Sequence, residues 1–237
     1  MSAPVLITGA AKRIGLFIAR SLREQGVEVI GTYRRQQPAL GELEAMGVQL
    51  YHCDFCESDH VHRLIDSLQR YHPALRGIIH NASDWIAEGQ SELSPEQVME
   101  RMMRVHAYAP YQLNLALAPL LRNCPDSVAD IIHITDFAVD KGSKHHIAYS
   151  ASKAASENLS RSFARLLAPQ VKVNSIAPSL ILFNEGDSDD YREHTLAKAL
   201  LPREPGEAEV LHAVTYLMES RYVTGRTLHL DGGRHLK

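Results

Sequence analysis

Several features that mark other classes of protein are scarce or absent in this sequence. No apolar run approaches the ~18 residues that a membrane span requires, and no cleavable signal pattern is visible, so we expect a cytoplasmic location. Only three cysteines and one tryptophan occur in 237 residues, and the formal net charge is −3. These values exclude a disulfide-rich scaffold, and the lack of a basic stripe argues against nucleic-acid binding.

Metal-binding patterns are also missing, although the chain has thirteen histidines. None lies in H-E-x-x-H, and His145 and His146 are adjacent, so on a helix they would diverge. Their position just before Tyr149 leaves open a role at the mouth of a site. Cys53 and Cys56 form a single C-x-x-C without a second pair, which favours an ordinary strand end over a redox or zinc element. We therefore expect no metal.

What the sequence does contain is a regular alternation of strand and helix patterns. Strands are predicted at Val5–Thr8, Glu28–Tyr33, Gln49–His52, Gly77–His80, Asp130–Ile134, Lys172–Ile176 and Thr227–Leu230. Helices are predicted at Arg13–Gln25, Pro38–Met46, Ser58–Tyr71, Pro95–Leu121, Ile147–Leu167 and Ala208–Ser220. This order predicts an α/β fold, a single-domain Rossmann-type doubly wound parallel sheet over residues 1–237 with helices on both faces.

Residues 184–205 interrupt the alternation. The first ten of them hold five acidic residues and one arginine, Arg192. The segment follows the sixth predicted strand, and open α/β sheets bind ligands beyond the carboxyl ends of their strands. We therefore expect a substrate lid here, with a solvated surface loop as the alternative.

A glycine turn near the amino terminus predicts a nucleotide site. The apolar run that ends at Thr8 leads into Gly9-Ala10-Ala11-Lys12-Arg13-Ile14-Gly15, and an amphipathic stretch follows. In a strand–turn–helix unit, Gly9 allows the tight turn and the helix amino terminus offers free N–H groups to a pyrophosphate. An ordinary strand-to-helix turn is the alternative.

The spacing of Tyr149 and Lys153 predicts a proton-transfer site. They lie four positions apart, so both side chains project from one helix face. A nearby ammonium lowers the pKa of a phenol, which suits it to general acid–base work. Asp136 lies thirteen residues before the tyrosine. The Y-x-x-x-K pattern alone is weak, and its weight comes from the motifs around it.

Motifs in the right order resemble the short-chain dehydrogenase/reductase family, over nearly the whole chain. The family's glycine pattern is met at Thr8, Gly9 and Gly15, with Arg13 in place of the middle glycine. The further matches are Asp54 at the adenine-contacting aspartate, His80–Ser83 at the N-N-A-G motif, Tyr149 and Lys153 at the catalytic pair, Val173–Pro178, and Asp231–Gly233.

Departures from the family pattern resemble its pteridine-reductase subgroup. Asp136 stands at the position of the usual catalytic serine, and His106 stands at that of an asparagine. Trp85 follows two residues after the N-A-S motif, as an aromatic residue does in this subgroup. The stretches Ile176–Glu185 and Leu230–Leu236 also resemble bacterial members of the subgroup. This resemblance implies NADPH-dependent reduction of 7,8-dihydromonapterin to tetrahydromonapterin, with weaker action on dihydrofolate or dihydrobiopterin. The alternatives are a reductase of a ketone or oxoacyl thioester, or a catalytically weak nucleotide-binding regulator.

NADPH is also favoured by charge. NAD-preferring folds usually end the second strand with a carboxylate that binds the ribose 2′-hydroxyl, but residues 32–37 contain none. Arg13, Arg34 and Arg35 could converge on a 2′-phosphate. The alternative is that Arg34 and Arg35 only solvate a loop.

The resemblance assigns roles to specific positions. Catalysis falls to Tyr149, Lys153 and Asp136, and a pterin would contact Trp85, Asp136, Tyr149 and Ser179. Cofactor contacts fall to Gly9, Arg13, Ile14, Gly15, Arg34, Arg35, Asp54, Asn81, Ala82, Ser83, Tyr149, Lys153 and Pro178. Related reductases pair the helices predicted at Pro95–Leu121 and Ile147–Leu167 between subunits, which implies a homotetramer, or failing that a dimer.

Overall fold

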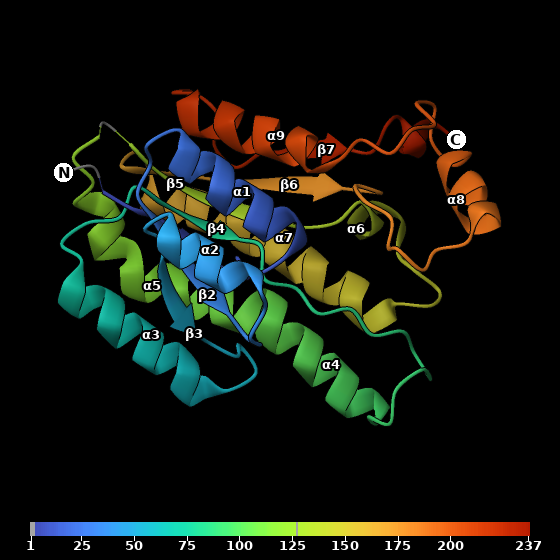
Figure 1. The fold of residues 1–237 in the computed structure, drawn as a ribbon, viewed down its shortest axis with the longest axis horizontal. Helices are drawn as coiled ribbons and strands as arrows, with labels where there is room; N and C mark the ends of the chain where they lie inside the picture. Colours follow the sequence, from blue (N-terminus) through green and yellow to red (C-terminus); the bar gives the residue numbers. More distant parts are fainter. Residues whose placement is uncertain (1–2, 127) are drawn as a thin grey trace.

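The computed structural model describes residues 3–126 and 128–237, and its centre is a seven-stranded parallel sheet (Figure 1). The strand order is β3-β2-β1-β4-β5-β6-β7. The strands are β1 (Val5–Ile7), β2 (Val29–Tyr33), β3 (Gln49–His52), β4 (Gly77–His80), β5 (Ala129–Ile134), β6 (Val171–Pro178) and β7 (Thr227–Leu230). The order reverses between β1 and β4, and ligands bind at such a switch point. The predicted fold class is confirmed.

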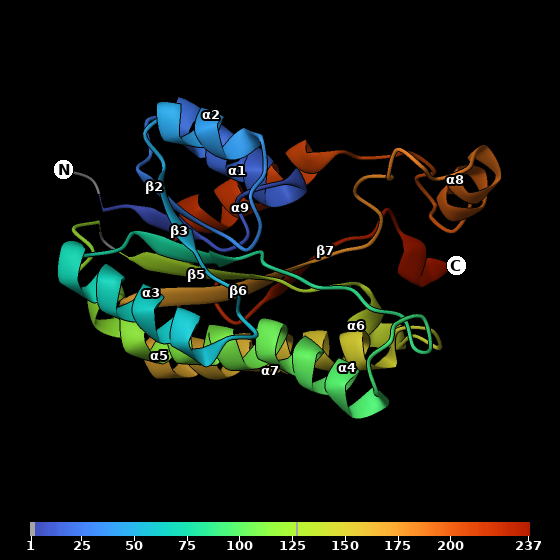
Figure 2. The ribbon, with the colours of Figure 1, turned by 60° about the horizontal axis from the view of Figure 1, so that its bottom comes forward.

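Helices cover both faces of the sheet. Figure 2 shows α1, α2 and α9 on one face and α3, α4, α5 and α7 on the other. The helices are α1 (Arg13–Glu24), α2 (Ala39–Ala45), α3 (Ser58–Tyr71), α4 (Pro95–Met103), the π-helix η1 (Arg104–Tyr108), α5 (Ala109–Arg122), α6 (Ala138–Lys141), α7 (Ile147–Leu167), α8 (Asp189–Leu196), α9 (Glu207–Glu219) and the 3₁₀ turn η2 (Arg234–Leu236).

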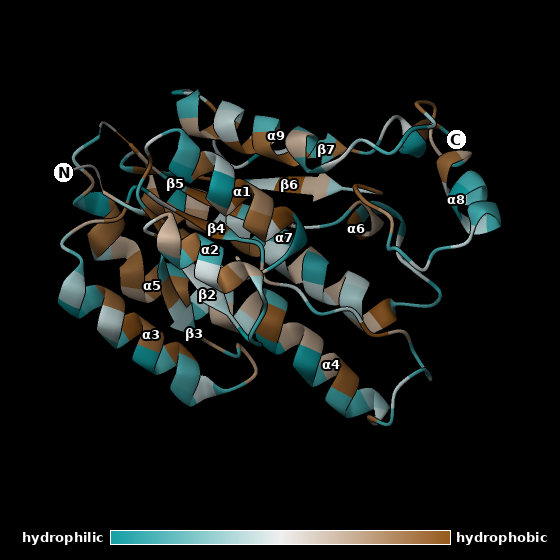
Figure 3. Cartoon of the chain, viewed as in Figure 1, coloured by the Kyte–Doolittle hydropathy of each residue, from teal (hydrophilic) through white to brown (hydrophobic). Residues whose placement is uncertain are grey.

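The core divides into two apolar layers because alternate strand residues point to opposite faces. Leu6 and Ile78 pack with α3 and α5 on one side, and Val5 and Ile7 pack with α1 and α9 on the other. Both faces are covered, so β1 and the centre of β4 consist of buried apolar residues, while α8 is largely hydrophilic, teal in Figure 3. No helix in the described ranges has the length and apolarity needed to cross a bilayer.

Three local features differ from the sequence prediction. The single helix expected over Pro95–Leu121 is α4, η1 and α5 in succession, because a π-helical turn inserts at Arg104–Tyr108. The segment 184–205 contains α8, which begins where the Ser188 hydroxyl accepts the N–H of Tyr191. The short α6 was also not predicted. Both helices are short, and neither has the long amphipathic pattern from which a helix is predicted.

Candidate active site

The predicted site residues follow the carboxyl ends of the strands on both sides of the switch point. Gly9 follows β1, Asn81 follows β4, Asp136 follows β5 and Pro178 ends β6. Parallel strands bring these ends to one edge of the sheet. This is the edge at which α6 and α8 lie (Figure 1).

The turn after β1 requires glycine at two points. Gly9 has a φ of 70°, in the left-handed region. A Cβ on Gly15 would lie 2.2 Å from the carbonyl oxygen of Gly9 and 2.4 Å from Nδ2 of Asn81. Asn81 in turn donates from Nδ2 to the carbonyls of Thr8 and Gly9, at 3.1 and 3.0 Å. The side chain of Asn81 thus holds the turn against the end of β4, in space that a side chain at Gly15 would fill.

The start of α1 fits a phosphate group. Its N-cap residue, Lys12, provides no side-chain cap, and the first turn contains no acidic residue. The N–H groups at this end are thus open to an anion, as they are in known dinucleotide sites. Arg13, at the family's middle glycine position, adopts a φ of 51°. Arg13 therefore keeps the left-handed backbone conformation that glycine adopts most easily, and it adds a positive charge beside the turn.

Tyr149 and Asp136 are in direct contact. The hydroxyl of Tyr149 donates to Oδ2 of Asp136 at 2.8 Å, and Oδ1 accepts the N–H of Ala138 at 2.7 Å. Lys153 is buried, donates from Nζ to the carbonyl of Ile134 at 2.8 Å, and lies 5.6 Å from the centre of the Tyr149 ring. The three residues assigned to catalysis are therefore brought together.

The electrostatics of this group differ from the sequence expectation. Burial raises the pKa of Tyr149 well above its usual value, and the Asp136 carboxylate raises it further. Burial lowers the pKa of Lys153 to about 8, opposed by Asp136. In the protein alone, therefore, Lys153 does not make the phenol acidic, because its ammonium is directed to a backbone carbonyl. Tyr149 is a protonated donor at neutral pH.

Helix α7 is fixed against β5 at three levels. Tyr149 pairs with Asp136, Lys153 with the carbonyl of Ile134, and Ser156 with His133, whose Nδ1 lies 3.1 Å from the serine hydroxyl. The helix residues are spaced so that all three face the sheet. These three hydrogen bonds, from Tyr149 to Ser156, fix the position of the helix and so of Tyr149 relative to β5.

Trp85 lies beside the start of α7. Its ring is stacked on His146, with centroids 4.0 Å apart and an interplanar angle of 14°. The indole is nevertheless 65% exposed, so its other face is open. Glu88, three residues on, accepts the N–H of Ala148 at 2.9 Å, and its own N–H binds the carbonyl of His145 at 3.1 Å. The loop carrying Trp85 is thus held on α7.

His106 links the N-A-S loop to α7. The hydroxyl of Ser152 donates to the carbonyl of Tyr149, so His106 Nδ1, 2.8 Å from that hydroxyl, carries the proton. Its Nε2 then accepts from Ser83 at 2.9 Å and from the N–H of Asp84 at 3.3 Å. Burial lowers the pKa of His106 well below its usual value, and Lys153 lowers it further. His106 is therefore a neutral connector.

The three predicted phosphate arginines do not converge in the structure. Arg13 donates from Nη1 to Asn184 Oδ1 at 2.6 Å, which ties the glycine turn to the segment 184–205. Arg34 pairs with Asp84 at 2.8 Å, and Arg35 is exposed. Sequence reasoning found no carboxylate at the end of β2, but the fold brings one there from the end of β4.

The remaining predicted contacts lie around the same edge. Asp54 accepts the N–H of Cys56 at 3.0 Å after β3, and the N–H of Ala82 donates to the Thr8 hydroxyl. Ile14 is partly buried in the first turn of α1, and Pro178 is buried at the end of β6. Ser179 lines a separate cavity of about 210 Å³ between the segment 184–205 and the C-terminal turn.

Three contacts were not foreseen from the sequence: Asp84 on Arg34, His146 on Trp85, and His106 on Ser83 and Ser152. Two positions gave a signal: His146, close to Tyr149, and His106, at the family's asparagine position. No group of three or more His, Cys, Asp or Glu side chains suited to a metal occurs among residues 3–126 and 128–237.

Comparisons with known proteins agree with this arrangement. A family model described as enoyl-(acyl carrier protein) reductase matches residues 9–235. Dihydromonapterin reductase of Klebsiella pneumoniae is 50% identical over 99% of this chain and 97% of its own length. That of Citrobacter koseri is 49% identical over the same shares. The crystal structure of FolM alternative dihydrofolate reductase 1 from Brucella canis, complexed with NADP, has a TM-score of 0.85 and 30% identity, covering 99% of this chain and 94% of that one.

Proposed function

Because the chain belongs to the short-chain dehydrogenase/reductase family, we propose that it reduces 7,8-dihydromonapterin to tetrahydromonapterin with NADPH. Dihydrofolate and dihydrobiopterin are weaker substrates of the same site. The observation that carries the proposal is the 2.8 Å contact between Asp136 and Tyr149, where a carboxylate occupies the place of the family's serine hydroxyl. Relatives named for this reaction are 50% identical over nearly the whole chain.

The residues around the switch point fit NADPH. The glycine turn and the uncapped start of α1 suit the pyrophosphate, and the Arg34 guanidinium suits a 2′-phosphate. Lys153 would bind the nicotinamide ribose hydroxyls, the role that the family resemblance gives it. The Brucella relative is itself complexed with NADP.

A carboxylate beside the phenol suits a ligand that is rich in N–H groups. Asp136 cannot donate a hydrogen bond to a ketone in the way a serine does, but it accepts from the amino-pyrimidinone edge of a pterin. The exposed face of Trp85 offers a flat apolar surface to the ring. These two residues favour a pterin over a ketone or a thioester.

The chemistry that NADPH supplies when bound is a hydride, which goes to C6 of the dihydropterin. Reduction of the C6–N5 double bond then needs one proton at N5. Tyr149 is protonated at neutral pH and holds that proton. Pterin N–H groups that bind Asp136 compete with the phenol for its oxygens, and so free the Tyr149 hydroxyl to donate to N5. Solvent then returns the proton to the tyrosine.

Assembly as a homotetramer, with a dimer as the alternative, belongs to the same proposal. Tyr108, Tyr111 and Leu115 lie along one side of the continuous helix η1–α5, and each is at least 42% exposed. Apolar side chains gathered in this way favour an interface between subunits.

An assay of NADPH oxidation tests the function. We expect turnover with 7,8-dihydromonapterin, slower turnover with dihydrobiopterin and dihydrofolate, and none with an acetoacetyl or enoyl thioester. Faster turnover of a thioester than of any pterin would overturn the proposal in favour of an acyl reductase. Absence of turnover with every substrate, together with tight NADPH binding, would favour a nucleotide-binding regulator.

A further inference from the structure

Two ion pairs meet on one carboxylate beyond the carboxyl ends of β2 and β4. Asp84, after β4, accepts from Arg34, after β2, at 2.8 Å. The same oxygen, Oδ2, accepts from Nε of Arg101 on α4 at 2.6 Å, and Nη2 of Arg101 forms an ion pair with it, also at 2.6 Å. Strands β2 and β4 lie on either side of β1, so this cluster reaches across the end of the strand that leads into the glycine turn.

The two arginines share the carboxylate unequally. Arg101 approaches Asp84 with two donors and Arg34 with one. Within the described ranges the Nε and Nη2 groups of Arg34 donate to no protein acceptor. Burial opposes ionisation of Asp84, but hydrogen bonds from both arginines hold its pKa below its usual value. The three side chains together therefore carry one net positive charge at neutral pH. Arg34 keeps two nitrogens, Nε and Nη2, without a protein acceptor in the described ranges, whereas Arg101 keeps one, Nη1.

We propose that Arg101 is a positioning residue for cofactor selection: by holding Asp84 it leaves the Arg34 guanidinium available to the 2′-phosphate of NADPH. This inference rests on the proposed function, which places Arg34 at that phosphate. Without Arg101, Asp84 would pair with Arg34 alone and cancel its charge. The cluster would then present a carboxylate to the ribose, as NAD-preferring folds do.

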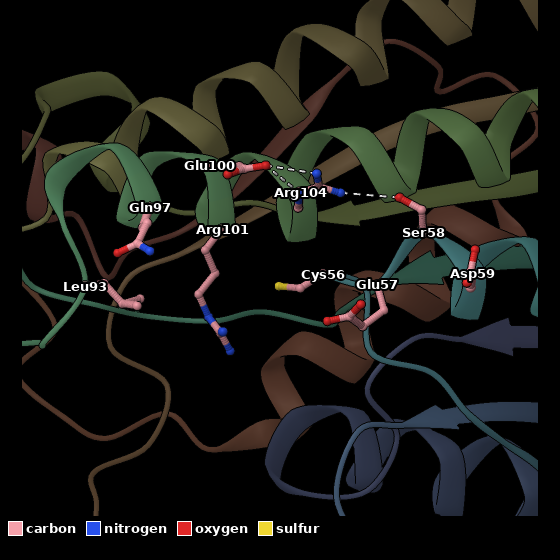
Figure 4. A pocket seen from close by; sticks show the side chains of 9 residues that line it. All are labelled: Cys56, Glu57, Ser58, Asp59, Leu93, Gln97, Glu100, Arg101 and Arg104. Carbon is pink, nitrogen blue, oxygen red and sulfur yellow. Dashed lines mark hydrogen bonds and ion pairs between the residues drawn. The ribbon is translucent and has the colours of Figure 1, made fainter.

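Arg101 and the nearby Arg104 have different interaction partners. Arg101 lies on the wall of a cavity of about 610 Å³ between α4 and the start of α3. Figure 4 shows its side chain directed away from Arg104, whose interactions lead to Glu100 and Ser58. Arg104 thus has the same charge, on the same continuous helix, but a different set of partners. It provides a matched control.

The direct test is the binding of two fragments that differ only in the 2′-phosphate, measured by calorimetry. We expect Arg101→Ala to weaken binding of adenosine 2′,5′-bisphosphate about tenfold and to change binding of adenosine 5′-monophosphate less than about twofold. Arg104→Ala should leave both within about twofold. The ratio of the KM values for NADPH and NADH should change in parallel.

A second substitution separates positioning from simple loss of charge. In the double variant Asp84→Asn/Arg101→Ala, no carboxylate competes for Arg34, so binding of the bisphosphate should return to within about threefold of wild type. A double variant as weak as Arg101→Ala would overturn the inference, since Arg101 would then act directly on the phosphate. So would an Arg101→Ala variant that binds the bisphosphate normally.

Failure of this inference is distinguishable from failure of the proposed function. If Arg34→Ala removes the preference for the bisphosphate but Arg101→Ala does not, the cofactor assignment stands and the role of Arg101 falls. If Arg34→Ala has no effect on either fragment, the assignment of the 2′-phosphate to Arg34 is itself wrong.

Discussion

At the scale of single residues, the proposed chemistry depends on a phenol that its own surroundings make less acidic. Asp136 and burial both raise the pKa of Tyr149, while the ammonium of Lys153 is directed to the carbonyl of Ile134. Because its pKa is raised, Tyr149 stays protonated at neutral pH, so it can act as a general acid but not as a general base. The site is therefore suited to reduction, in which the protein has to supply a proton, more than to the reverse reaction.

Replacing Tyr149 by phenylalanine removes the proton donor and leaves the ring in place. We expect Tyr149→Phe to lower kcat by roughly 10²–10⁴-fold, the usual size of a lost general acid. NADPH affinity, measured by fluorescence titration, should stay close to wild type, because Lys153 and the glycine turn remain. Wild-type turnover by this variant would remove Tyr149 from the mechanism.

The pH profile should report Lys153 and not Tyr149. Burial lowers the pKa of Lys153 to about 8, so the lysine is protonated below that pH and loses its charge above it. The pKa of Tyr149 is raised, so the phenol keeps its proton through this range. We therefore expect kcat/KM to fall on the alkaline side near pH 8. In Lys153→Arg this fall should vanish from the accessible range, since arginine stays charged; an unchanged limb would assign it to another group.

Individual contacts were the part of the site least accessible to sequence reasoning. The spacing of Tyr149, Lys153 and Asp136 predicted a cluster because a helical turn fixes the first pair and a family motif fixes the third. The ion pair between Asp84 and Arg34 joins residues fifty positions apart, through the order of strands in the sheet. No local pattern encodes such a contact.

At the scale of elements, α7 is the helix that positions the chemistry, and its start depends on another segment. Its N-cap residue, His146, provides no side-chain cap, and the carboxylate of Glu88 accepts the N–H of Ala148 instead. The N–H groups of Ala148 and Ile147 lower the pKa of Glu88, although burial opposes this. The loop that carries Trp85 and the helix that carries Tyr149 are thereby coupled.

Removing this cap should loosen both segments. We expect Glu88→Ala to cost about 1 kcal/mol, as for other lost helix caps, and to lower Tm by about 2–4 °C. The KM for the pterin should rise more than that for NADPH, since Trp85 shares the loop. Glu92→Ala, an exposed change in the same loop, is the control. Equal melting temperatures for the two variants, measured by calorimetry, would contradict the capping role.

The regular elements were predictable because each carries a periodic apolar pattern. The seven strands and the long helices α3 and α7 lie where hydrophobic periodicity placed them, within a few residues. The π-helical turn Arg104–Tyr108 was not predictable, because it adds only one residue to one turn and leaves the helical pattern on either side unchanged. Helix α8 was missed since its eight residues are mostly charged or polar.

At the scale of the whole molecule, the exposed side of η1–α5 favours assembly. We expect light scattering at micromolar concentration to report a tetramer, and Leu115→Glu to reduce it to smaller species by burying a charge at the interface. Ala45→Glu on α2, an exposed residue on the opposite face of the sheet, should leave the mass unchanged. A monomeric wild-type protein would reject both the tetramer and the dimer.

The charge of the lid segment should set the choice between pterins. Residues 184–193 hold five acidic side chains and one arginine, Arg192. Arg192 donates to the carbonyls of Asn184 and Asp187 and lies over the ring of Phe183, so much of its hydrogen-bonding capacity is used within the lid. Dihydrofolate brings two carboxylates on its glutamate tail, whereas a pterin with a polyol side chain is neutral. The lid should therefore repel dihydrofolate in particular.

We expect kcat/KM for dihydromonapterin to exceed that for dihydrofolate, with a larger ratio at low ionic strength. The Debye length is about 30 Å at 0.01 M salt and about 8 Å at physiological salt, so the lid acts over a longer range in dilute buffer. Glu185→Gln/Glu193→Gln removes two exposed charges and should raise kcat/KM for dihydrofolate alone, most at low salt. Glu44→Gln on α2, away from the lid, is the control. If dihydrofolate is the better wild-type substrate at both salt concentrations, the lid is not an acidic filter and the enzyme is primarily a folate reductase.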